Sequence, residues 1–364
     1  MPTPRAFCFL IPGDWSIPTG GFGYDRRLTQ ALVAAGWAVD VRRLDAAWPA
    51  PDTAALARAR AVVADIADGS TVVADGLAFG VLHDVVAAHA ERLRWVALVH
   101  HPLHLETGLA AAQRQRLRES ESRALSFARS VVVTSPRTAQ DVAAMGVPAA
   151  RIHVVEPGTD AWPQGPAGRP APLPAPARTD GPVRLLCVAT VTPRKGHALL
   201  LQALAGLQRR PFPSWQLHCV GSLARDAATA ARVQALAREL ALAGRVVWHG
   251  EVDAAALQAH YAAADLLVLA SLHEGYGMVV AEALAAGLPV LASDAGALAQ
   301  TLPAQAGWRV PPGDVPALQA ALQRLIGDPA LREQLAAGAR EAGRRLPDWP
   351  TQAARFAAVL DALP

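Results

Sequence analysis

Two carboxylates lie in a glycine-rich stretch whose pattern suits a phosphorylated ligand. Residues 271–291 read SLHEGYGMVVAEALAAGLPVL, and an apolar run at 266–270 precedes them. This pattern predicts a strand, a glycine-rich turn and a helix that ends near Gly287. The N-terminus of such a helix attracts a diphosphate, because its backbone N–H groups and partial positive charge point at the ligand. Glu274 and Glu282 could then accept hydrogen bonds from sugar and ribose hydroxyls.

The same stretch resembles a signature of known enzymes. Glu274, seven residues and then Glu282, followed by Gly287-x-Pro289-Val290, is similar to the signature of the retaining GT-B glycosyltransferases of family 4. The resemblance implies that Glu274 is a catalytic residue near the donor sugar and that Glu282 binds the nucleotide ribose. An ordinary strand–turn–helix with two solvated glutamates is the less favoured alternative. The donor-binding residues implied here are Gly275, Tyr276, Gly277, Met278, Val279 and Glu282.

Two adjacent cations form a second candidate site. Arg194 and Lys195 lie between an apolar strand pattern at 183–190 and a leucine-rich helix pattern. Two positive charges at such a turn suit an anionic ligand, although a solvated basic turn is the alternative. In family 4 a Gly-Arg pair and a later Lys-Gly pair hold the donor diphosphate. Lys195 and the glycine after it match, which implies a catalytic and donor-binding lysine. Ala189-Thr190 stands roughly where Gly-Arg is expected, so Arg194 is the candidate substitute for the missing arginine.

A pair of glycines opens the first predicted helix, at about 24–35. Gly20 and Gly21 follow Thr19 in the sequence TGGFGY. The pattern by itself fits a tight turn and a phosphate or sugar contact equally well. It resembles the Gly-Gly loop by which family members reach the donor from the N-terminal domain, so Gly20 and Gly21 are predicted to bind donor. It is not a Walker A loop, because no Gly-Lys-Ser/Thr follows.

Two histidines follow an apolar strand pattern at 94–99. Side chains at the carboxyl end of a parallel strand often take part in chemistry, and histidine titrates near neutrality. The resemblance implies that His100 is catalytic and lies close to the donor sugar. His101 is the competing assignment, and a structural loop histidine is the alternative for either one alone. His101 and Glu106 are weaker candidates for acceptor binding, and Asp75, at another strand end, is interpreted mainly as a turn residue.

Composition narrows the class of protein. The 364 residues are 52% hydrophobic and 18% charged, with a formal net charge of +3. The chain is long enough for two domains, and its charge balance does not call for nucleic acid. The three cysteines lie in apolar runs without metal-ligand spacing and predict buried free thiols in a reducing compartment. No apolar stretch reaches the ~18 residues of a membrane span, and no signal peptide is visible. We therefore expect a cytoplasmic protein, with peripheral contact at the inner membrane face left open.

Strand and helix patterns alternate along the chain and predict an α/β fold. The resemblance implies a GT-B fold, with two Rossmann-like doubly wound domains that face an interdomain cleft. We predict an N-terminal acceptor-side domain at 1–165, a proline-rich linker at 166–182 and a donor-binding domain at 183–346. A C-terminal helix at 350–363 could return to the first domain. Val62-Val63 is predicted as a short strand.

Together with these features, the resemblance to family 4 implies a retaining glycosyltransferase that moves a sugar from a nucleoside diphosphate sugar to a glycan, lipid or small-molecule acceptor. No cofactor and no metal are expected, because no Asp-x-Asp pair or zinc spacing lies in a site-like context. Two alternatives stay open, a nucleotide-sugar epimerase on the same fold and a non-catalytic nucleotide-sugar binding protein. The sequence names neither the sugar, the base, the acceptor nor the oligomeric state.

Overall fold

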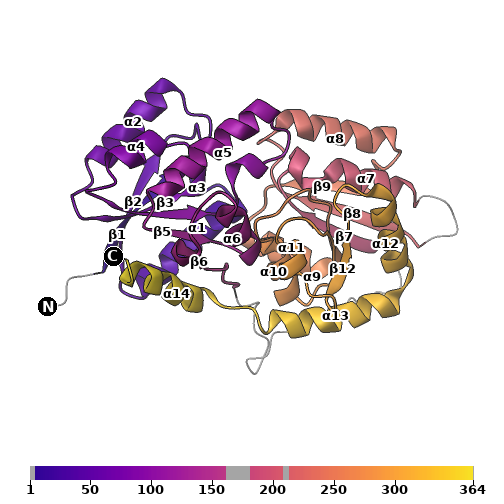
Figure 1. Cartoon of the computed structure of the whole chain (residues 1–364). Helices are drawn as coiled ribbons and strands as arrows, with labels where there is room; N and C mark the ends of the chain where they lie inside the picture. Colours follow the sequence, from indigo (N-terminus) through magenta and orange to yellow (C-terminus); the bar gives the residue numbers. More distant parts are fainter. Residues whose placement is uncertain (1–4, 161–180, 208–212, 364) are drawn as a thin grey trace. The chain divides into compact units, whose positions relative to one another are not determined.

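The protein consists of two compact α/β units, which Figure 1 shows in the colours of the sequence. The structure, a computed structural model, describes residues 5–160, 181–207 and 213–363. Unit 1 comprises Met1–Gly158 and Pro347–Pro364, and unit 2 comprises Thr159–Leu346. Each unit has a parallel six-stranded sheet flanked by helices, which confirms the predicted α/β fold. The predicted linker at 166–182 lies almost entirely outside the described residues.

The sheet of unit 1 has the strand order β2-β1-β3-β4-β5-β6. The chain leaves β1 toward one edge and then returns to the other side of β1, so the order reverses between β1 and β3. In sheets of this kind the carboxyl ends of the strands at the reversal point form the ligand site. The strands are β1 (Ala6–Pro12), β2 (Ala38–Leu44), β3 (Thr71–Asp75), β4 (Arg94–Val99), β5 (Ser130–Val133) and β6 (Ile152–Val154).

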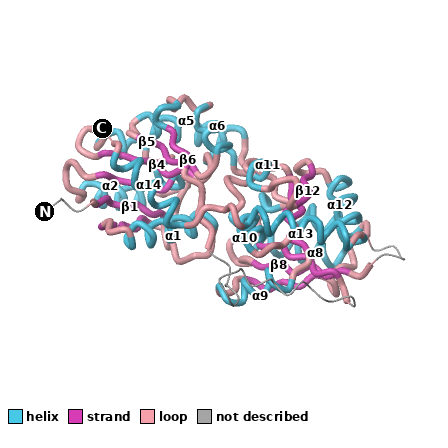
Figure 2. Tube along the Cα trace, turned by 90° about the horizontal axis from the view of Figure 1, so that it is seen from below, coloured by secondary structure: helices cyan, strands magenta, loops and turns pink. Residues whose placement is uncertain are grey.

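The helices of unit 1 cover the sheet, and Figure 2 distinguishes them from the strands by colour. They are α1 (Gly20–Ala34), α2 (Thr53–Ala64), α3 (Gly76–Phe79), α4 (His83–Ala88), α5 (Ala111–Ser126) and α6 (Pro136–Ala143), with short 3-10 turns η1 (Leu103–Leu105) and η2 (Ala149–Arg151). Because both faces are covered, the middle residues of the central strands are apolar. Val72, Val73 and Ala74 of β3 are all fully buried.

The last helix, α14 (Trp349–Asp361), belongs to unit 1 although the chain has passed through unit 2 before it. It packs against α1, where the ring centroids of Trp349 and Tyr24 are 5.6 Å apart. Phe356 lies 6.3 Å from Phe7 of β1 by the same measure. The N-terminal unit is therefore completed by the C-terminal end of the chain.

The sheet of unit 2 has the order β12-β11-β10-β7-β8-β9, and its reversal point lies between β7 and β10. The strands are β7 (Val183–Val188), β8 (Trp215–Val220), β9 (Val246–Gly250), β10 (Leu266–Leu269), β11 (Val290–Ser293) and β12 (Gly307–Val310). The helices are α7 (His197–Ala205), α8 (Ala227–Glu239), α9 (Ala254–Ala263), α10 (Met278–Ala285), α11 (Leu298–Thr301), α12 (Val315–Gly327) and α13 (Pro329–Gly343), with the 3-10 turn η3 (Pro193–Lys195).

Two local predictions were wrong. Val62-Val63 lies in α2 and not in a strand, because Asp52 caps that helix and Ala55, Ala59 and Val63 recur at four-residue spacing on its buried face. The glycines at 20 and 21 open α1 as predicted, but they form its first turn, so the helix begins at Gly20 and not near Tyr24. Thr19 is the N-cap, and its hydroxyl oxygen accepts a hydrogen bond from the backbone N–H of Phe22.

The cysteines and the lengths of the helices bear on two predictions made from composition. Cys8, Cys187 and Cys219 are free and buried, which confirms the interpretation as buried thiols. Within the described ranges, no helix has both the length and the apolar character needed to cross a bilayer.

Candidate functional site

The reversal point of unit 2 brings the two charged turns of the sequence together. β7 and β10 are neighbours in the sheet and run parallel, so the turns that follow them emerge at the same edge. The backbone N–H of Leu272 donates to the carbonyl of Arg194, with 2.7 Å between the two atoms. The turn that carries the cations is thus directly joined to the turn that carries Glu274.

Glu274 is the centre of this cluster and is only 6% exposed. Its Oε1 lies 2.5 Å from Nζ of Lys195 and accepts a 2.7 Å hydrogen bond from the Ser271 hydroxyl. Nη1 of Arg194 lies 3.6 Å from the other oxygen, Oε2, and donates to the backbone carbonyl of His273. Sequence reasoning placed these charges at different parts of a ligand, whereas the structure joins them in one ion-paired group.

The ion pairs keep Glu274 ionised in spite of its burial. Burial alone would raise the pKa of its carboxyl group, but the charges of Lys195 and Arg194, with the hydrogen bonds it accepts, lower the pKa to about 2. A carboxylate held between two cations gives them an anionic partner before any ligand binds. An incoming phosphate can then take over part of that role.

Lys195 is the only lysine in the chain, and the other 33 of its 34 Lys and Arg residues are arginine. An ammonium group is a compact point charge with three donors, whereas a guanidinium is planar and rigid. A lone lysine among so many arginines indicates a position where the two are not interchangeable. The sequence alone carries this signal, which strengthens the assignment of Lys195.

Two glycines allow the close approach of these turns. Gly196 has a left-handed φ of 67°, and a Cβ at this position would collide with the carbonyl oxygen of Ala270 after β10. Gly277, the N-cap of α10, has a φ of 91°, and its Cβ would collide with Leu298. Both conformations favour glycine because it lacks a Cβ.

The N-terminus of α10 lies immediately after the Glu274 turn. Among the described residues no side chain caps this helix end, where Met278 and Val279 form the first helical positions. Gly275 is half-buried in the turn, and the carbonyl of buried Tyr276 accepts a 2.6 Å hydrogen bond from the Thr301 hydroxyl. The turn therefore places the positive end of the α10 helix dipole in the same site as the two cations, which suits an anionic ligand.

Glu282 lies apart from this cluster, inside α10. Its Oε2 accepts a 2.7 Å hydrogen bond from the hydroxyl of Tyr261 on α9. Burial raises the pKa of Glu282, and the hydrogen bond from Tyr261 opposes that shift. Tyr261 was not singled out from the sequence, since nothing in its local pattern distinguishes it from a core tyrosine.

A second cluster lies at the reversal point of unit 1 and includes His100. Nε2 of His100 is 3.1 Å from Oδ1 of Asp25 and 3.3 Å from Oδ2 of Asp75. Asp25 comes from α1, Asp75 from the end of β3, and His100 follows β4. Gly21 packs on the imidazole, because a Cβ at Gly21 would lie 3.2 Å from its Cδ2. Close packing on His100 is therefore one role of Gly21, whereas Gly20 opens the helix beside it.

The two aspartates hold His100 in its protonated form. Burial alone would lower its pKa, but the charge of Asp25 and hydrogen bonds to both carboxylates raise it to about 10. Burial likewise raises the pKa of Asp25 to about 7, against the effect of His100. The pKa of His100 thus lies well above the value near 6.5 of an unperturbed histidine.

Asp25 was missed by sequence reasoning. The sequence marks Asp25 only as an acidic residue at a position that faces the core in a helix pattern. In the structure its side chain is fully buried. Asp75 has the predicted turn role, because its Oδ1 accepts from the backbone N–H of Leu77, and it also contacts His100.

The two weaker candidates for acceptor binding are also neighbours. Nε2 of His101 lies 3.6 Å from Oε2 of Glu106, and both residues are partly exposed. His100, His101 and Glu106 thus all lie in the segment that follows β4, whereas Gly20 and Gly21 lie in α1.

Both halves of the chain match known glycosyltransferase families. The sequence model described as Glycosyltransferase Family 4 matches residues 24–162, and the model described as Glycosyl transferases group 1 matches residues 174–342. The chain is 32% identical over 253 residues to a D-inositol 3-phosphate glycosyltransferase of Xylanimonas cellulosilytica, covering 66% of this chain and 58% of that protein. It is 32% identical over 223 residues to a GDP-mannose-dependent alpha-(1-6)-phosphatidylinositol monomannoside mannosyltransferase of Mycolicibacterium smegmatis, covering 58% and 57%. The chain thus spans a little over half the length of these relatives.

Solved structures match over nearly the full length. Sucrose-phosphate synthase of Thermosynechococcus elongatus has a TM-score of 0.81 and 26% identity, with 99% of each chain covered. HepE of Anabaena, solved in complex with UDP-glucose, has a TM-score of 0.75 and 18% identity, with 98% and 100% covered. At that lower identity the likeness concerns the fold.

Proposed function

The chain belongs to the family 4 glycosyltransferases with the GT-B fold, and from this we propose that it transfers a sugar from a nucleoside diphosphate sugar to an acceptor with retention of configuration. The observation that carries the proposal is the cluster at the reversal point of unit 2. Two cations and a helix N-terminus converge there on one buried glutamate. Retention is a property of the family that the sequence signature resembles.

In this proposal the cluster stabilises the departing diphosphate. Lys195 and Arg194 supply positive charge, and the first N–H groups of α10 supply fixed dipoles. When the phosphates bind to Lys195, the ammonium group is shared between them and Glu274. The carboxylate of Glu274 is then placed beside the donor sugar. Because fixed donors and charges are already in place, little reorganisation is required as charge develops on the leaving group.

Glu282 is proposed to bind the ribose of the nucleotide. Its position inside α10 is beyond the N-terminal turn that would hold the phosphates. Tyr261 orients the carboxylate by donating to Oε2. In unit 1, protonated His100 is proposed to donate a hydrogen bond to the donor sugar, and His101 and Glu106 are proposed to contact the acceptor.

The relatives define a first panel of substrates. One is GDP-mannose-dependent, one is named for D-inositol 3-phosphate, and one structure contains UDP-glucose. Thermal unfolding in the presence of GDP-mannose, UDP-glucose and related nucleotide sugars should reveal the donor. A ligand at 100 times its Kd stabilises the folded state by roughly 2.7 kcal/mol. Transfer to inositol phosphates, phosphatidylinositol lipids and glycans would then be followed by mass spectrometry.

The outcomes of that experiment separate the alternatives. We expect one nucleotide sugar to raise the unfolding temperature and to release nucleoside diphosphate when an acceptor is present. Turnover without acceptor and without release of diphosphate would favour the epimerase. Binding without turnover for every acceptor class would favour the binding protein, and no binding at all would contradict the proposal.

A chelator is expected to leave sugar transfer unaffected at temperatures well below unfolding. The proposed site neutralises the diphosphate with Lys195, Arg194 and a helix N-terminus, so a divalent ion has no required role there. The measurement is the initial rate of transfer before and after EDTA. Loss of activity that Mg²⁺ or Mn²⁺ restores would show that the donor site needs a metal.

The two glutamates are expected to act on different parts of the donor. Glu282→Gln should weaken binding of the nucleoside diphosphate itself, because a charge-assisted hydrogen bond contributes roughly 1.5–3 kcal/mol. Glu274→Gln should mainly weaken the intact donor, because it releases Lys195 from its ion pair and leaves the phosphate contacts in place. Calorimetric titration of each variant with diphosphate and with donor measures both effects. Glu239→Gln, at an exposed position on α8, is the control. Equal weakening of diphosphate and donor by Glu274→Gln would overturn this division of roles.

A further inference from the structure

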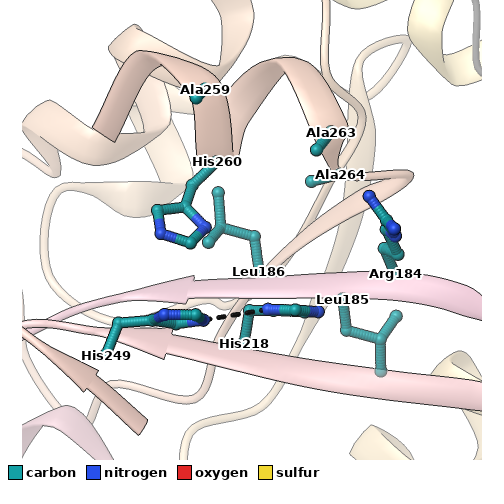
Figure 3. Close-up of a pocket in the computed structure, with 9 residues that line it drawn as sticks. All are labelled: Arg184, Leu185, Leu186, His218, His249, Ala259, His260, Ala263 and Ala264. Carbon is teal, nitrogen blue, oxygen red and sulfur yellow. Dashed lines mark hydrogen bonds between the residues drawn. The ribbon is translucent and has the colours of Figure 1, made fainter. Parts of the chain in front are cut away.

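Three histidines line a pocket of about 280 Å³ on the β8–β9 side of unit 2. His218 lies on β8, His249 on the edge strand β9 and His260 on α9, and Figure 3 shows the three rings grouped at one end of the pocket. The side chains of this cluster are not among those of the proposed donor site, and the comparisons assign them no role.

The strand register explains why the rings meet. His218 pairs with Val247 across the β8–β9 ladder, and His249 lies two residues further along the same strand. The β8–β9 register shifts by one residue just after this pair, so His249 is the extra residue of β9. Its ring lies beside that of His218, with 2.9 Å between the nearest nitrogens. α9 crosses this part of the sheet and adds His260 from above (Figure 3).

The nitrogens are close enough to share one ion. Nδ1 of His218 is 2.9 Å from Nε2 of His249, and the two rings are stacked with an interplanar angle of 10°. The ring centroids of His249 and His260 are 4.3 Å apart. One ring nitrogen from each of the three residues lies within 4.8 Å of the others.

A neighbouring side chain fixes the orientation of the first ring. Nε2 of His218 lies 3.1 Å from Oε1 of Gln216, which is two residues earlier on the same face of β8. An amide oxygen accepts only, so Nε2 carries the proton and Nδ1 presents its lone pair to the cluster. Metal-binding histidines in proteins are commonly oriented by such a hydrogen bond to the distal nitrogen.

We propose that His218, His249 and His260 bind one divalent transition metal ion of the zinc type, with water in the fourth position. Imidazole nitrogens suit Zn²⁺, Ni²⁺ and Cu²⁺. Two nitrogens bound at about 2.0–2.1 Å to a tetrahedral zinc lie roughly 3.3 Å apart, so small ring movements convert the observed cluster into a coordination site. On metal binding, the proton on Nε2 of His249, which is donated to Nδ1 of His218 in the observed cluster, moves to Nδ1 of His249 and leaves Nε2 free for the ion.

The charges around the three histidines are compatible with metal binding. Burial, together with the neighbouring histidines, lowers the pKa of His218 and His260, and imidazole binds metals in its neutral form. Arg184 also lines the pocket, but its guanidinium lies at the opposite end, beside Ala264 (Figure 3). The bound ion would tie the edge strand β9 to β8 and α9, and no step of sugar transfer passes through it.

The test uses the full-length protein without a histidine tag, stripped with EDTA and titrated with Zn²⁺ in a calorimeter. We expect one Zn²⁺ per chain and a rise in unfolding temperature. Co²⁺ should give the visible absorption of a tetrahedral site. His249→Gln and His260→Gln should each weaken Zn²⁺ binding by at least roughly 100-fold, because even loss of an orienting partner costs about 10–100-fold. Gln216→Leu, which removes the orienting partner of His218, should weaken Zn²⁺ binding by about 10–100-fold.

His89→Gln, in unit 1, is the matched control and should bind Zn²⁺ as the unaltered protein does. The Co²⁺ spectrum needs no variant, so it decides the matter even if a substitution impairs folding. Absence of stoichiometric Zn²⁺ binding, or binding that survives both histidine substitutions, would overturn the proposal and leave the cluster as stacked neutral rings. The donor-site proposal is independent, since nucleotide sugars bind in either case.

Discussion

Lys195→Ala is expected to lower the turnover of nucleotide sugar by roughly 100-fold or more, the scale seen when one preorganised donor to a developing oxyanion is removed. The loss should remain when the donor is saturating, because the ammonium group acts on the charge that develops on the leaving diphosphate. The fold should persist, since Glu274 keeps Arg194 and Ser271 as partners. The measurement is kcat with circular dichroism as the folding control.

Two companion variants sharpen this prediction. Lys195→Arg keeps the charge but replaces the compact ammonium with a planar fork, so it should recover only part of the rate. Arg194→Ala should cost less than Lys195→Ala, because the guanidinium is farther from Glu274 and is also held by the His273 carbonyl. A near-normal kcat for Lys195→Ala would remove this residue from the diphosphate site.

The unique lysine offers a direct spectroscopic test. Reductive ¹³C-methylation labels the ε-amino group of Lys195 and the chain's N-terminus, and it preserves the positive charge. Addition of nucleoside diphosphate should shift the Lys195 signal. An unchanged lysine signal under saturating diphosphate would place the ligand elsewhere.

His100→Gln is expected to destabilise unit 1 by about 3–5 kcal/mol, because it leaves Asp25 and Asp75 buried without their cation. Urea unfolding at pH 7 measures the loss, and His101→Gln is the control. Adding Asp25→Asn to His100→Gln should restore part of the stability, since a buried carboxyl that has to take up a proton once its cation is lost is then replaced by a neutral amide. If His100→Gln and His101→Gln have the same free energy of unfolding, His100 is not the cation of a buried ion pair with Asp25 and Asp75.

The pH dependence of His100 has a definite sign. Its pKa is about 10 in the folded protein and about 6.5 in an unfolded chain. A raised pKa stabilises the folded state fully below pH 6.5, and the stabilisation is lost as the pH rises toward 10. NMR titration should therefore find His100 protonated at pH 8 and its pKa lowered in Asp25→Asn. A pKa near 6.5 in the unaltered protein would contradict the assignment.

The parts of the fold that the sequence predicts are those with strong local patterns. Parallel strands buried on both faces appear as continuous apolar runs, so β3, β4, β7 and β10 are visible without any structure. Val62-Val63 is too short to show such a run, because two apolar residues fit a helix face as well as a strand. The turn at Glu274 was predictable because glycines, carboxylates and an apolar strand follow one another within a few residues.

The arrangement of the sites was not predictable, because their members are distant in sequence. Lys195 and Glu274 are 79 residues apart and meet only because β7 and β10 are neighbours. Asp25 reaches His100 across 75 residues. The histidine pocket depends on the register between β8 and β9, which no spacing in the sequence encodes. Interactions of this kind also set the pKa values, so the charge state of His100 could not be foreseen.

Calorimetric titration of the whole protein and of Lys195→Ala with UDP and GDP tests the central claim most directly. We expect the unaltered protein to bind one of these nucleoside diphosphates with one site per chain. Lys195→Ala should bind it at least about tenfold more weakly, since a charge-assisted hydrogen bond of roughly 1.5–3 kcal/mol is lost. Absence of binding for both nucleotides, or equal affinity in Lys195→Ala, would contradict a donor site built on Lys195 and Glu274.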